Sequence, residues 1–282
     1  MSIIEKAIRI RDAGTSAVSG KLAGRRPPDA RTSRSREGNS SAPANFMRLA
    51  AIGMLPDPEQ DPALVEQLRH LKRPILQNAF GPLANGAANV VMITSARPGA
   101  GKSFVSAALA VALTRARELS VVIIDLDNIR ATLTKGLELG DRIGFFDAIE
   151  DPDVSLESTL VATEIPGLRI IPTGRQTRDS AELLNSERAK QLMRRFSEDD
   201  PTRIIILDTP PLLSTPDAHA ILELADQIIV VVEAGVTKQS EMQNVLESVR
   251  GEKPIGLVLN KAVGGMTALY GDDYYAGTYD SA

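Results

Sequence analysis

The 282-residue chain is 43% hydrophobic, carries a formal net charge of −4 and contains no cysteine and two histidines. Its length is sufficient for one large α/β domain with appended segments. The lack of cysteine excludes disulfides and thiolate metal sites, and two isolated histidines argue against a histidine-built zinc site. The mild charge gives no indication of a nucleic-acid partner. Because no apolar run reaches the ~18 residues of a membrane span and no signal peptide is evident, we expect a cytoplasmic protein.

The first 48 residues differ in composition from the rest of the chain. Residues 1–14 place Ile3, Ile4 and Ile8 on one helical face, which predicts a short amphipathic helix that docks to a partner. Residues 15–48 are rich in Arg, Ser, Pro and Gly and predict a basic, disordered linker. This linker is interpreted as a solvated tether, with attraction to anionic lipid or to an acidic partner as the alternative.

A regular alternation of strands and helices is predicted over residues 49–265. Short apolar runs rich in Val and Ile occupy residues 89–94, 121–127, 168–174, 203–211, 226–234 and 255–261. Helical stretches such as 103–120 and 181–196 lie between them. Runs that are apolar on both faces are typical of a parallel sheet covered by helices. The sequence therefore predicts an α/β fold with a doubly wound, mostly parallel sheet and helices on both faces.

The first strand leads directly into the stretch SARPGAGKSF, which matches the Walker A phosphate-binding loop with Ala96 where glycine is usual. Two glycines let backbone N–H groups curl around phosphate, and the following helix adds a partial positive charge. Lys102 is expected to reach the β and γ phosphates of ATP, and Ser103 to hold Mg²⁺. The predicted nucleotide-binding residues are Ala96, Arg97, Pro98, Gly99, Ala100, Gly101, Lys102, Ser103, Phe104 and Asn260.

Three aspartates end neighbouring strands of the predicted sheet. Asp125 and Asp127 end the run VVIIDLD, and Asp208 ends RIIILDTPP, a Walker B pattern. In an open α/β sheet the ligand lies at the carboxyl ends of the strands, so these carboxylates should converge on the nucleotide. The predicted catalytic residues are Lys102, Asp125, Asp127 and Asp208, and the predicted metal ligands are Ser103, Asp127 and Asp208.

All four tyrosines of the chain lie in its final thirteen positions, at Tyr270, Tyr274, Tyr275 and Tyr279. The surrounding segment, residues 266–282, is polar and glycine-containing, which predicts a flexible tail. The nineteen residues 264–282 span on the order of 60 Å when extended, enough to enter the site of a neighbouring subunit. These tyrosines are therefore the predicted phosphoacceptors.

The stretches SARPGAGKS, IIDLDNIR, ELLNSERAKQL and IIILDTPPLLSTPDA, together with the terminal tyrosines, resemble the bacterial tyrosine kinases from about residue 45 onward. The subgroup most similar is the cytoplasmic autokinase of exopolysaccharide loci linked to exosortase sorting. The resemblance implies ATP- and Mg²⁺-dependent autophosphorylation and ring-shaped homo-oligomers. It also implies activation by a membrane-embedded polysaccharide chain-length regulator that recruits the protein to the inner face of the plasma membrane, and a tyrosine phosphatase as a further partner.

The same resemblance assigns roles to individual residues. It implies that Asp125 is the carboxylate that receives the phenol proton, with Asp127 and Asp208 around the metal. It implies an adenine contact for Asn260, although a turn or cap role is an equal alternative. The charges of residues 66–72, EQLRHLK, resemble a ring-packing motif, and an exposed salt-bridged helix explains them equally well. Where the family usually has two adjacent arginines after its acidic motif, this chain has Ile129 and Arg130.

Two other functions remain open from sequence. One is a partition-type ATPase switch that hydrolyses ATP with water and positions a partner; Arg97, which replaces the signature lysine of those ATPases, does not decide the matter. The other is a non-catalytic, nucleotide-binding scaffold for polysaccharide export. The crowding of tyrosines favours the kinase over the switch, and the three aspartates favour catalysis over the scaffold.

Overall fold

The structure is a computed structural model that describes residues 43–55, 62–81, 88–116, 118–249, 251 and 253–262. Its strands are β1 Val90–Ser95, β2 Ser120–Asp125, β3 Val161–Ala162, β4 Leu168–Ile171, β5 Arg203–Asp208, β6 Gln227–Glu233 and β7 Ile255–Asn260. They form one sheet in the order β3-β4-β2-β5-β1-β6-β7, parallel except for the β3–β4 pair. The predicted mostly parallel sheet is confirmed. Strand β3 was not predicted, because two residues leave no periodic signal.

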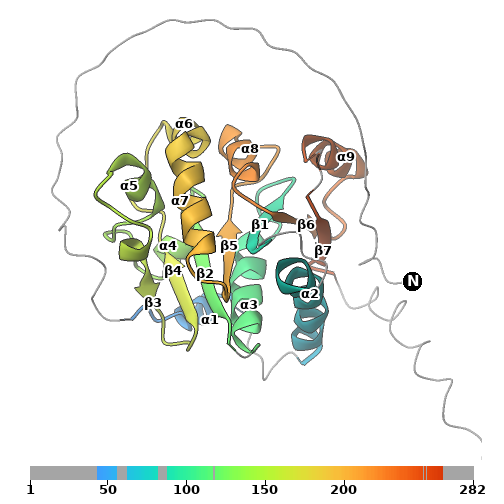
Figure 1. Cartoon of the computed structure of the whole chain (residues 1–282). Helices are drawn as coiled ribbons and strands as arrows, with labels where there is room; N and C mark the ends of the chain where they lie inside the picture. Colours follow the sequence, from blue (N-terminus) through green and yellow to red (C-terminus); the bar gives the residue numbers. More distant parts are fainter. Residues whose placement is uncertain are drawn as a thin grey trace, which may run out of the picture.

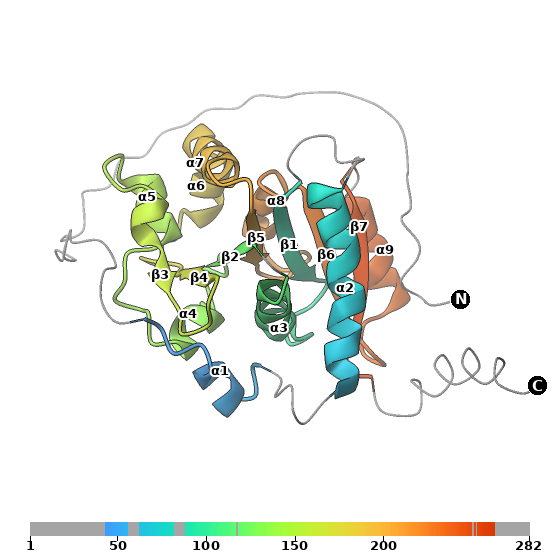
Figure 2. The same cartoon turned by 60° about the horizontal axis from the view of Figure 1, so that its bottom comes forward.

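Helices cover both faces of this sheet (Figures 1 and 2). One face is covered by α1 Arg48–Ala51, α2 Pro62–Phe80, α3 Lys102–Thr114 and α4 Thr132–Gly136. The other is covered by α5 Phe145–Glu150, α6 Ser180–Asn185, α7 Glu187–Glu198, α8 Pro216–Leu222 and α9 Gln239–Ser248, with a 3-10 turn at Glu157–Thr159. The arrangement is therefore doubly wound, as predicted.

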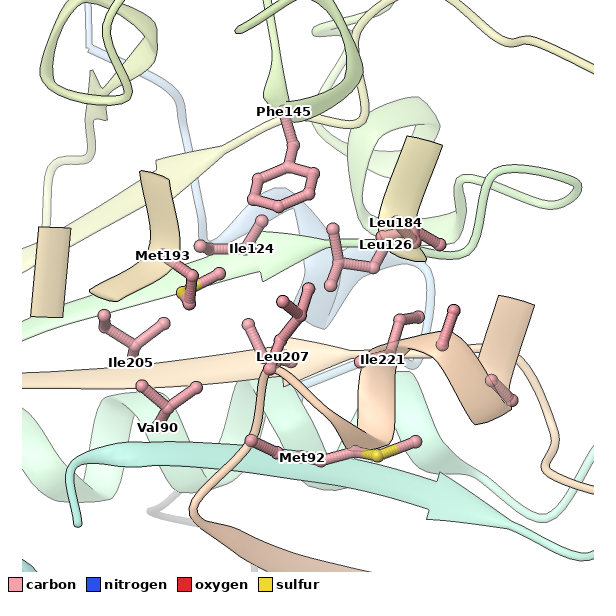
Figure 3. Close-up of a cluster of buried hydrophobic side chains, with 14 of the residues drawn as sticks. Val90, Met92, Ile124, Leu126, Phe145, Leu184, Met193, Ile205, Leu207 and Ile221 are labelled. Carbon is pink, nitrogen blue, oxygen red and sulfur yellow. The ribbon is translucent and has the colours of Figure 1, made fainter. Parts of the chain in front are cut away.

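Two hydrophobic cores result from the alternation of side chains along the strands. In β2, Val121 and Ile123 face the core under α3, whereas Val122 and Ile124 face the core under α5 and α7. Figure 3 shows the second core, in which Phe145 packs over strand residues such as Ile124. Burial on both faces explains why these strands read as continuous apolar runs.

Two helices predicted as continuous differ in the structure. The stretch 103–120 is helical only to Thr114, and Glu118 adopts a left-handed φ of 73°. The stretch 181–196 is divided at Ser186, which has extended backbone and accepts a hydrogen bond from the N–H of Ala189. A serine hydroxyl that caps a new helix competes with continuation of the old one, and the helical periodicity does not register this break.

Residues 43–48, which the sequence analysis assigns to the linker, pack against the domain. Phe46 is fully buried, and its N–H donates to Glu164 at 2.6 Å. Arg48 forms a two-pronged ion pair with Glu138, with N···O distances of 2.6 and 2.5 Å. The predicted N-terminal helix, most of the linker and the tail lie outside the described residues. Among the helices that are described, none is long and apolar enough to cross a membrane.

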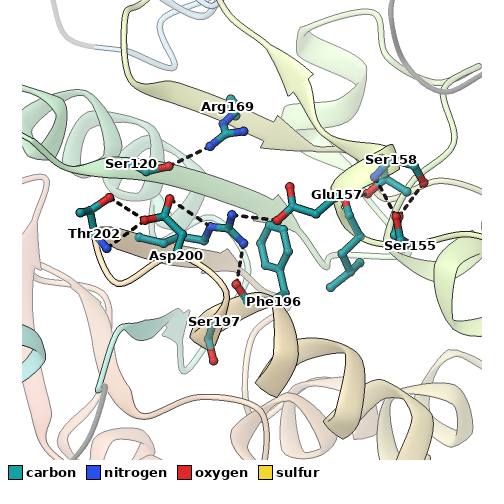
Figure 4. Close-up of polar contacts among 12 residues, drawn as sticks. Ser120, Ser155, Glu157, Ser158, Arg169, Phe196, Ser197, Asp200 and Thr202 are labelled. Atoms are coloured by element: carbon teal, nitrogen blue, oxygen red, sulfur yellow. Dashed lines mark hydrogen bonds and ion pairs between the residues drawn. The ribbon is translucent and has the colours of Figure 1, made fainter.

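A polar cluster joins the amino ends of the strands (Figure 4). Asp125, Asp127 and Asp208 lie at the other end of the sheet, where β2 and β5 finish. Arg203, at the start of β5, donates to the carbonyl of Phe196 at 2.5 Å and pairs with Glu157 at 2.8 Å. Its guanidinium also lies 4.0 Å from the ring centroid of Phe196. These contacts fix the 3-10 turn and the end of α7 to the sheet, so we interpret this edge as structural.

Candidate active site

The loop between β1 and α3 has the backbone shape that a phosphate-binding loop requires. Gly99 and Gly101 adopt left-handed φ angles of 88° and 92°. A Cβ on Gly101 would lie 2.2 Å from Nδ2 of Asn260, so no larger residue fits there without displacing that amide. Lys102 begins the thirteen-residue helix α3 directly after this loop. The free N–H groups of the loop and the helix end can therefore bind phosphate.

The last strand supports this loop from the side. Nδ2 of Asn260 donates to the carbonyl of Ala100 at 2.8 Å, and Nζ of Lys261 donates to the carbonyl of Gly99 at 2.7 Å. Lys261 is in turn held by Glu233 at 2.9 Å. These contacts favour a supporting role for Asn260, while the adenine contact stays a prediction. Lys261 was not predicted, because a lysine after a strand carries no distinctive signal.

Lys102 lies among the acidic residues rather than in solvent. Its side chain is buried, and burial lowers its pKa while the charges of Asp208 and Asp127 act in the opposite direction. The neighbouring Ser103 hydroxyl acts on the same carboxylate and lowers the pKa of Asp208. An ammonium group this close to two carboxylates is poised to exchange them for the phosphates of a bound nucleotide.

Asp125 and Asp208 are register partners at the ends of adjacent strands, so their carboxylates are brought together as predicted. Burial and the charge of Asp208 raise the pKa of Asp125 to about 7. Burial raises the pKa of Asp208 to about 6, although the hydroxyl of Ser103 and the charge of Lys102 lower it. A carboxylate with a pKa near neutrality can accept a proton under physiological conditions.

Oδ2 of Asp208 is buried without a hydrogen-bond partner, while Oδ1 accepts from Ser106 at 3.0 Å. A buried carboxylate oxygen of this kind is a ready ligand for a hard cation such as Mg²⁺. Asp127 is 5% exposed, and its charge, like that of Asp208, acts to raise the pKa of Lys102. No group of three or more His, Asp or Glu side chains in the described part of the chain could hold a metal by itself. Ser103 with one or two carboxylates therefore fits an ion that also binds nucleotide phosphates.

The remaining predicted nucleotide-binding residues belong to the loop itself or to the first turn of α3. Ala96 and Ala100 are buried, and the carbonyl of Arg97 accepts from the Ser95 hydroxyl at 2.6 Å. The Arg97 side chain is about half exposed and lies 3.4 Å from Glu241 on α9. Phe104 is half-buried against the core under α3. Residues 270–279, which carry the predicted phosphoacceptors, lie outside the described residues.

Comparisons with known proteins agree on the family. Residues 91–276 match the CobQ/CobB/MinD/ParA nucleotide binding domain family. The tyrosine-protein kinase ptk of Acinetobacter johnsonii is 30% identical over 211 residues, covering 74% of this chain but 28% of that protein. The tyrosine-protein kinase YwqD of Bacillus subtilis is 30% identical over 193 residues, covering 68% of this chain and 78% of that protein. The chain belongs to the bacterial tyrosine-protein kinases.

A solved structure supports this membership. The chimerical protein CapA2B2 superimposes with a TM-score of 0.61 at 27% identity, covering 70% of this chain and 84% of that one.

Within the family, the chain's Ile129 is 64% exposed and stands where one of the paired arginines was expected. Arg130 remains, and its charge acts on Lys102. Several polar residues around the aspartates were not predicted, namely Ser106, Thr134 and Thr173, because a serine or threonine inside a helix or strand end is common.

Proposed function

We propose that this chain transfers the γ-phosphoryl group of ATP to tyrosines of its own C-terminal segment, in the same or a neighbouring subunit. The observation that carries the proposal is the confinement of all four tyrosines to the last thirteen residues of a bacterial tyrosine-kinase chain. A switch that hydrolyses ATP with water has no need of such a segment.

The side chains at the site divide the work of the transfer. The tyrosine oxygen forms a bond to the γ-phosphorus, the bond from that phosphorus to the β–γ bridging oxygen breaks, and ADP leaves. The phenol has an ordinary pKa near 10, so its proton must pass to a base. Asp125 is proposed as that base because its raised pKa suits proton uptake near pH 7. Lys102 is proposed to neutralise the charge that moves onto the β and γ phosphates.

Mg²⁺ would be held by Ser103, Asp208 and Asp127, and when bound it supplies charge neutralisation and in-line orientation of the phosphates. The unpartnered Oδ2 of Asp208 supports this assignment. Ser106 keeps the other oxygen of Asp208 occupied at 3.0 Å and thereby fixes the direction of the carboxylate. The backbone N–H groups from Gly99 to Ser103 are proposed to bind the phosphates themselves.

The same proposal extends to assembly and regulation. We propose a homo-oligomeric ring, activation and membrane recruitment by a polysaccharide chain-length regulator, and removal of phosphate by a tyrosine phosphatase. In the ring motif, Arg69 and His70 both contact Glu66 within α2, at 2.8 and 3.5 Å, so these charges also have a purely intrahelical explanation.

Intact mass after incubation with Mg·ATP tests the proposal directly. We expect additions of about 80 Da per phosphoryl group, up to four. The additions should be absent from Lys102→Met and from a variant in which all four tyrosines are replaced by phenylalanine. Circular dichroism of both variants controls for folding. ATP consumption without added mass in the wild-type protein would refute the kinase and support the ATPase switch.

A further inference from the structure

Residues 172–177, the segment that follows β4, hydrogen-bond to the acidic loop of the site, which we define as residues 125–134. The hydroxyl of Thr173 donates to the carbonyl of Asp125 at 3.1 Å, and its N–H donates to Oγ1 of Thr134 at 3.0 Å. Thr134 directs its own hydroxyl and N–H onto Oδ2 of Asp125, both at 2.8 Å. The second oxygen, Oδ1, accepts from the N–H of Asp127 at 3.3 Å. The orientation of Asp125 is thus determined by two threonines that lie outside the phosphate loop.

A second set of hydrogen bonds joins the same segment to Asn128, the residue after Asp127. Nδ2 of Asn128 donates to the carbonyl of Thr177 at 2.6 Å, and Oδ1 accepts from the N–H of the same residue at 3.1 Å. Gln176 completes the contact by donating from Nε2 to the carbonyl of Asn128 at 2.7 Å. Asn128 is only 6% exposed, so both halves of its amide are paired inside the protein.

These two sets of hydrogen bonds lie on either side of Asp127, whose own side chain accepts one local hydrogen bond. Its Oδ1 accepts from the N–H of Arg130 at 3.0 Å, and no side chain of the described residues donates to Oδ2. Asp127 therefore owes its place to the backbone on either side of it. That backbone is fixed to the segment after β4 by the carbonyl of Asp125 on one side, which accepts from Thr173, and by Asn128 on the other.

We propose that the segment after β4 is a positioning element for phosphoryl transfer, acting through Asn128 and Thr134. Their side chains hydrogen-bond to the segment after β4 and to Asp125, and in this way they hold the carboxylates of Asp125 and Asp127 in place for transfer. The inference rests on the proposed kinase function and gives a role to two residues outside the predicted catalytic, nucleotide-binding and metal-binding sets. Contacts of this kind are worth about 10- to 100-fold in activity where they orient functional carboxylates.

The test uses full-length protein and three substitutions. Asn128→Ala removes the double amide contact, Thr134→Val removes one hydroxyl at nearly constant shape, and Thr134→Ser restores it. Asn185→Ala is the matched control, because Asn185 is exposed and bonds only the carbonyl of Ala181 within its helix, at 3.0 Å. The measurements are kcat and KM for ATP at saturating Mg²⁺, and amide hydrogen exchange over residues 126–134.

We expect Asn128→Ala and Thr134→Val to lower kcat about tenfold or more while KM for ATP stays within about threefold, because the phosphate loop is untouched. Thr134→Ser and Asn185→Ala should retain kcat within about twofold. Exchange over residues 126–134 should be faster in the two impaired variants and unchanged in the other two.

The inference is overturned if both impaired variants keep wild-type kcat, or if their loss matches the fraction of unfolded protein. Unchanged exchange over residues 126–134 also overturns it, whatever the activity. A wild-type protein that adds no phosphate refutes the proposed kinase function instead, and the exchange measurement then still decides whether these residues hold the acidic loop.

Discussion

Asp208→Asn should abolish phosphoryl transfer and yet make the metal-free protein more stable at neutral and alkaline pH. The wild-type carboxylate is buried beside Asp125, with one oxygen unpartnered. Its pKa is raised from 3.8 to about 6, with burial as the largest cause. Because one pH unit corresponds to about 1.4 kcal/mol, ionising this group in the fold costs about 3 kcal/mol relative to the unfolded chain.

The sign of the pH dependence follows from proton binding. Between about pH 4 and 6 the folded protein retains the Asp208 proton that the unfolded chain has lost. The free energy of unfolding of the wild type therefore falls as pH rises through this window. Asparagine keeps the acceptor for Ser106 and carries no charge. We expect the variant to gain about 1–3 kcal/mol at pH 8 and almost nothing at pH 4.

Urea denaturation in EDTA at several pH values measures this difference. With an m-value of about 2 kcal/mol/M, a gain of 2 kcal/mol moves the midpoint by about 1 M. Asp200→Asn is a control of opposite sign: burial raises the pKa of Asp200, but hydrogen bonds from Thr202 and the charge of Arg203 lower it on balance. That variant should lose stability above about pH 4. The reasoning is contradicted if Asp208→Asn is less stable than wild type at pH 8, or if the difference in the free energy of unfolding does not change with pH.

Two further substitutions probe the phosphate loop and the domain boundary. Gly101→Ala places a Cβ 2.2 Å from Nδ2 of Asn260 at a φ of 92°. Left-handed backbone costs alanine about 1–2 kcal/mol, so fluorescent-ADP titration should show at least tenfold weaker binding, with Gly53→Ala as a control away from the site. Phe46→Ala should lower the free energy of unfolding by about 3–5 kcal/mol because Phe46 is fully buried, and a loss under 1 kcal/mol would return residues 43–48 to the linker.

The sheet and the phosphate loop could be predicted because their signals are local. Apolar runs in β1, β2 and β5 are continuous since both faces are covered, and the loop shape depends on glycines that the motif itself contains. Contacts between distant segments could not be predicted. The pairing of Phe46 with Glu164 spans 118 residues, and that of Asn260 with Ala100 spans 160. Nothing in the residue types of either partner indicates the other.

Asn128 illustrates the same limit within the site. By sequence it is only the residue that follows the acidic motif, whereas in the structure its amide pairs with the backbone of Thr177, 49 residues away. The break at Ser186 has a local signal, because a serine followed by an acidic residue such as Glu187 in the first turn is a helix-start pattern. It was outweighed by helical periodicity on both sides.

The support that Asn260 and Lys261 give to the phosphate loop has a consequence for how the protein is made. These two residues leave the ribosome some 160 residues after the carbonyls they hold at Ala100 and Gly99. A nascent chain that has not yet added β7 has the loop sequence but lacks the contacts that fix its shape. Competence to bind nucleotide therefore requires that β7 has been added, and the tyrosine segment follows within about twenty residues, so that the site and its proposed substrate are completed almost together.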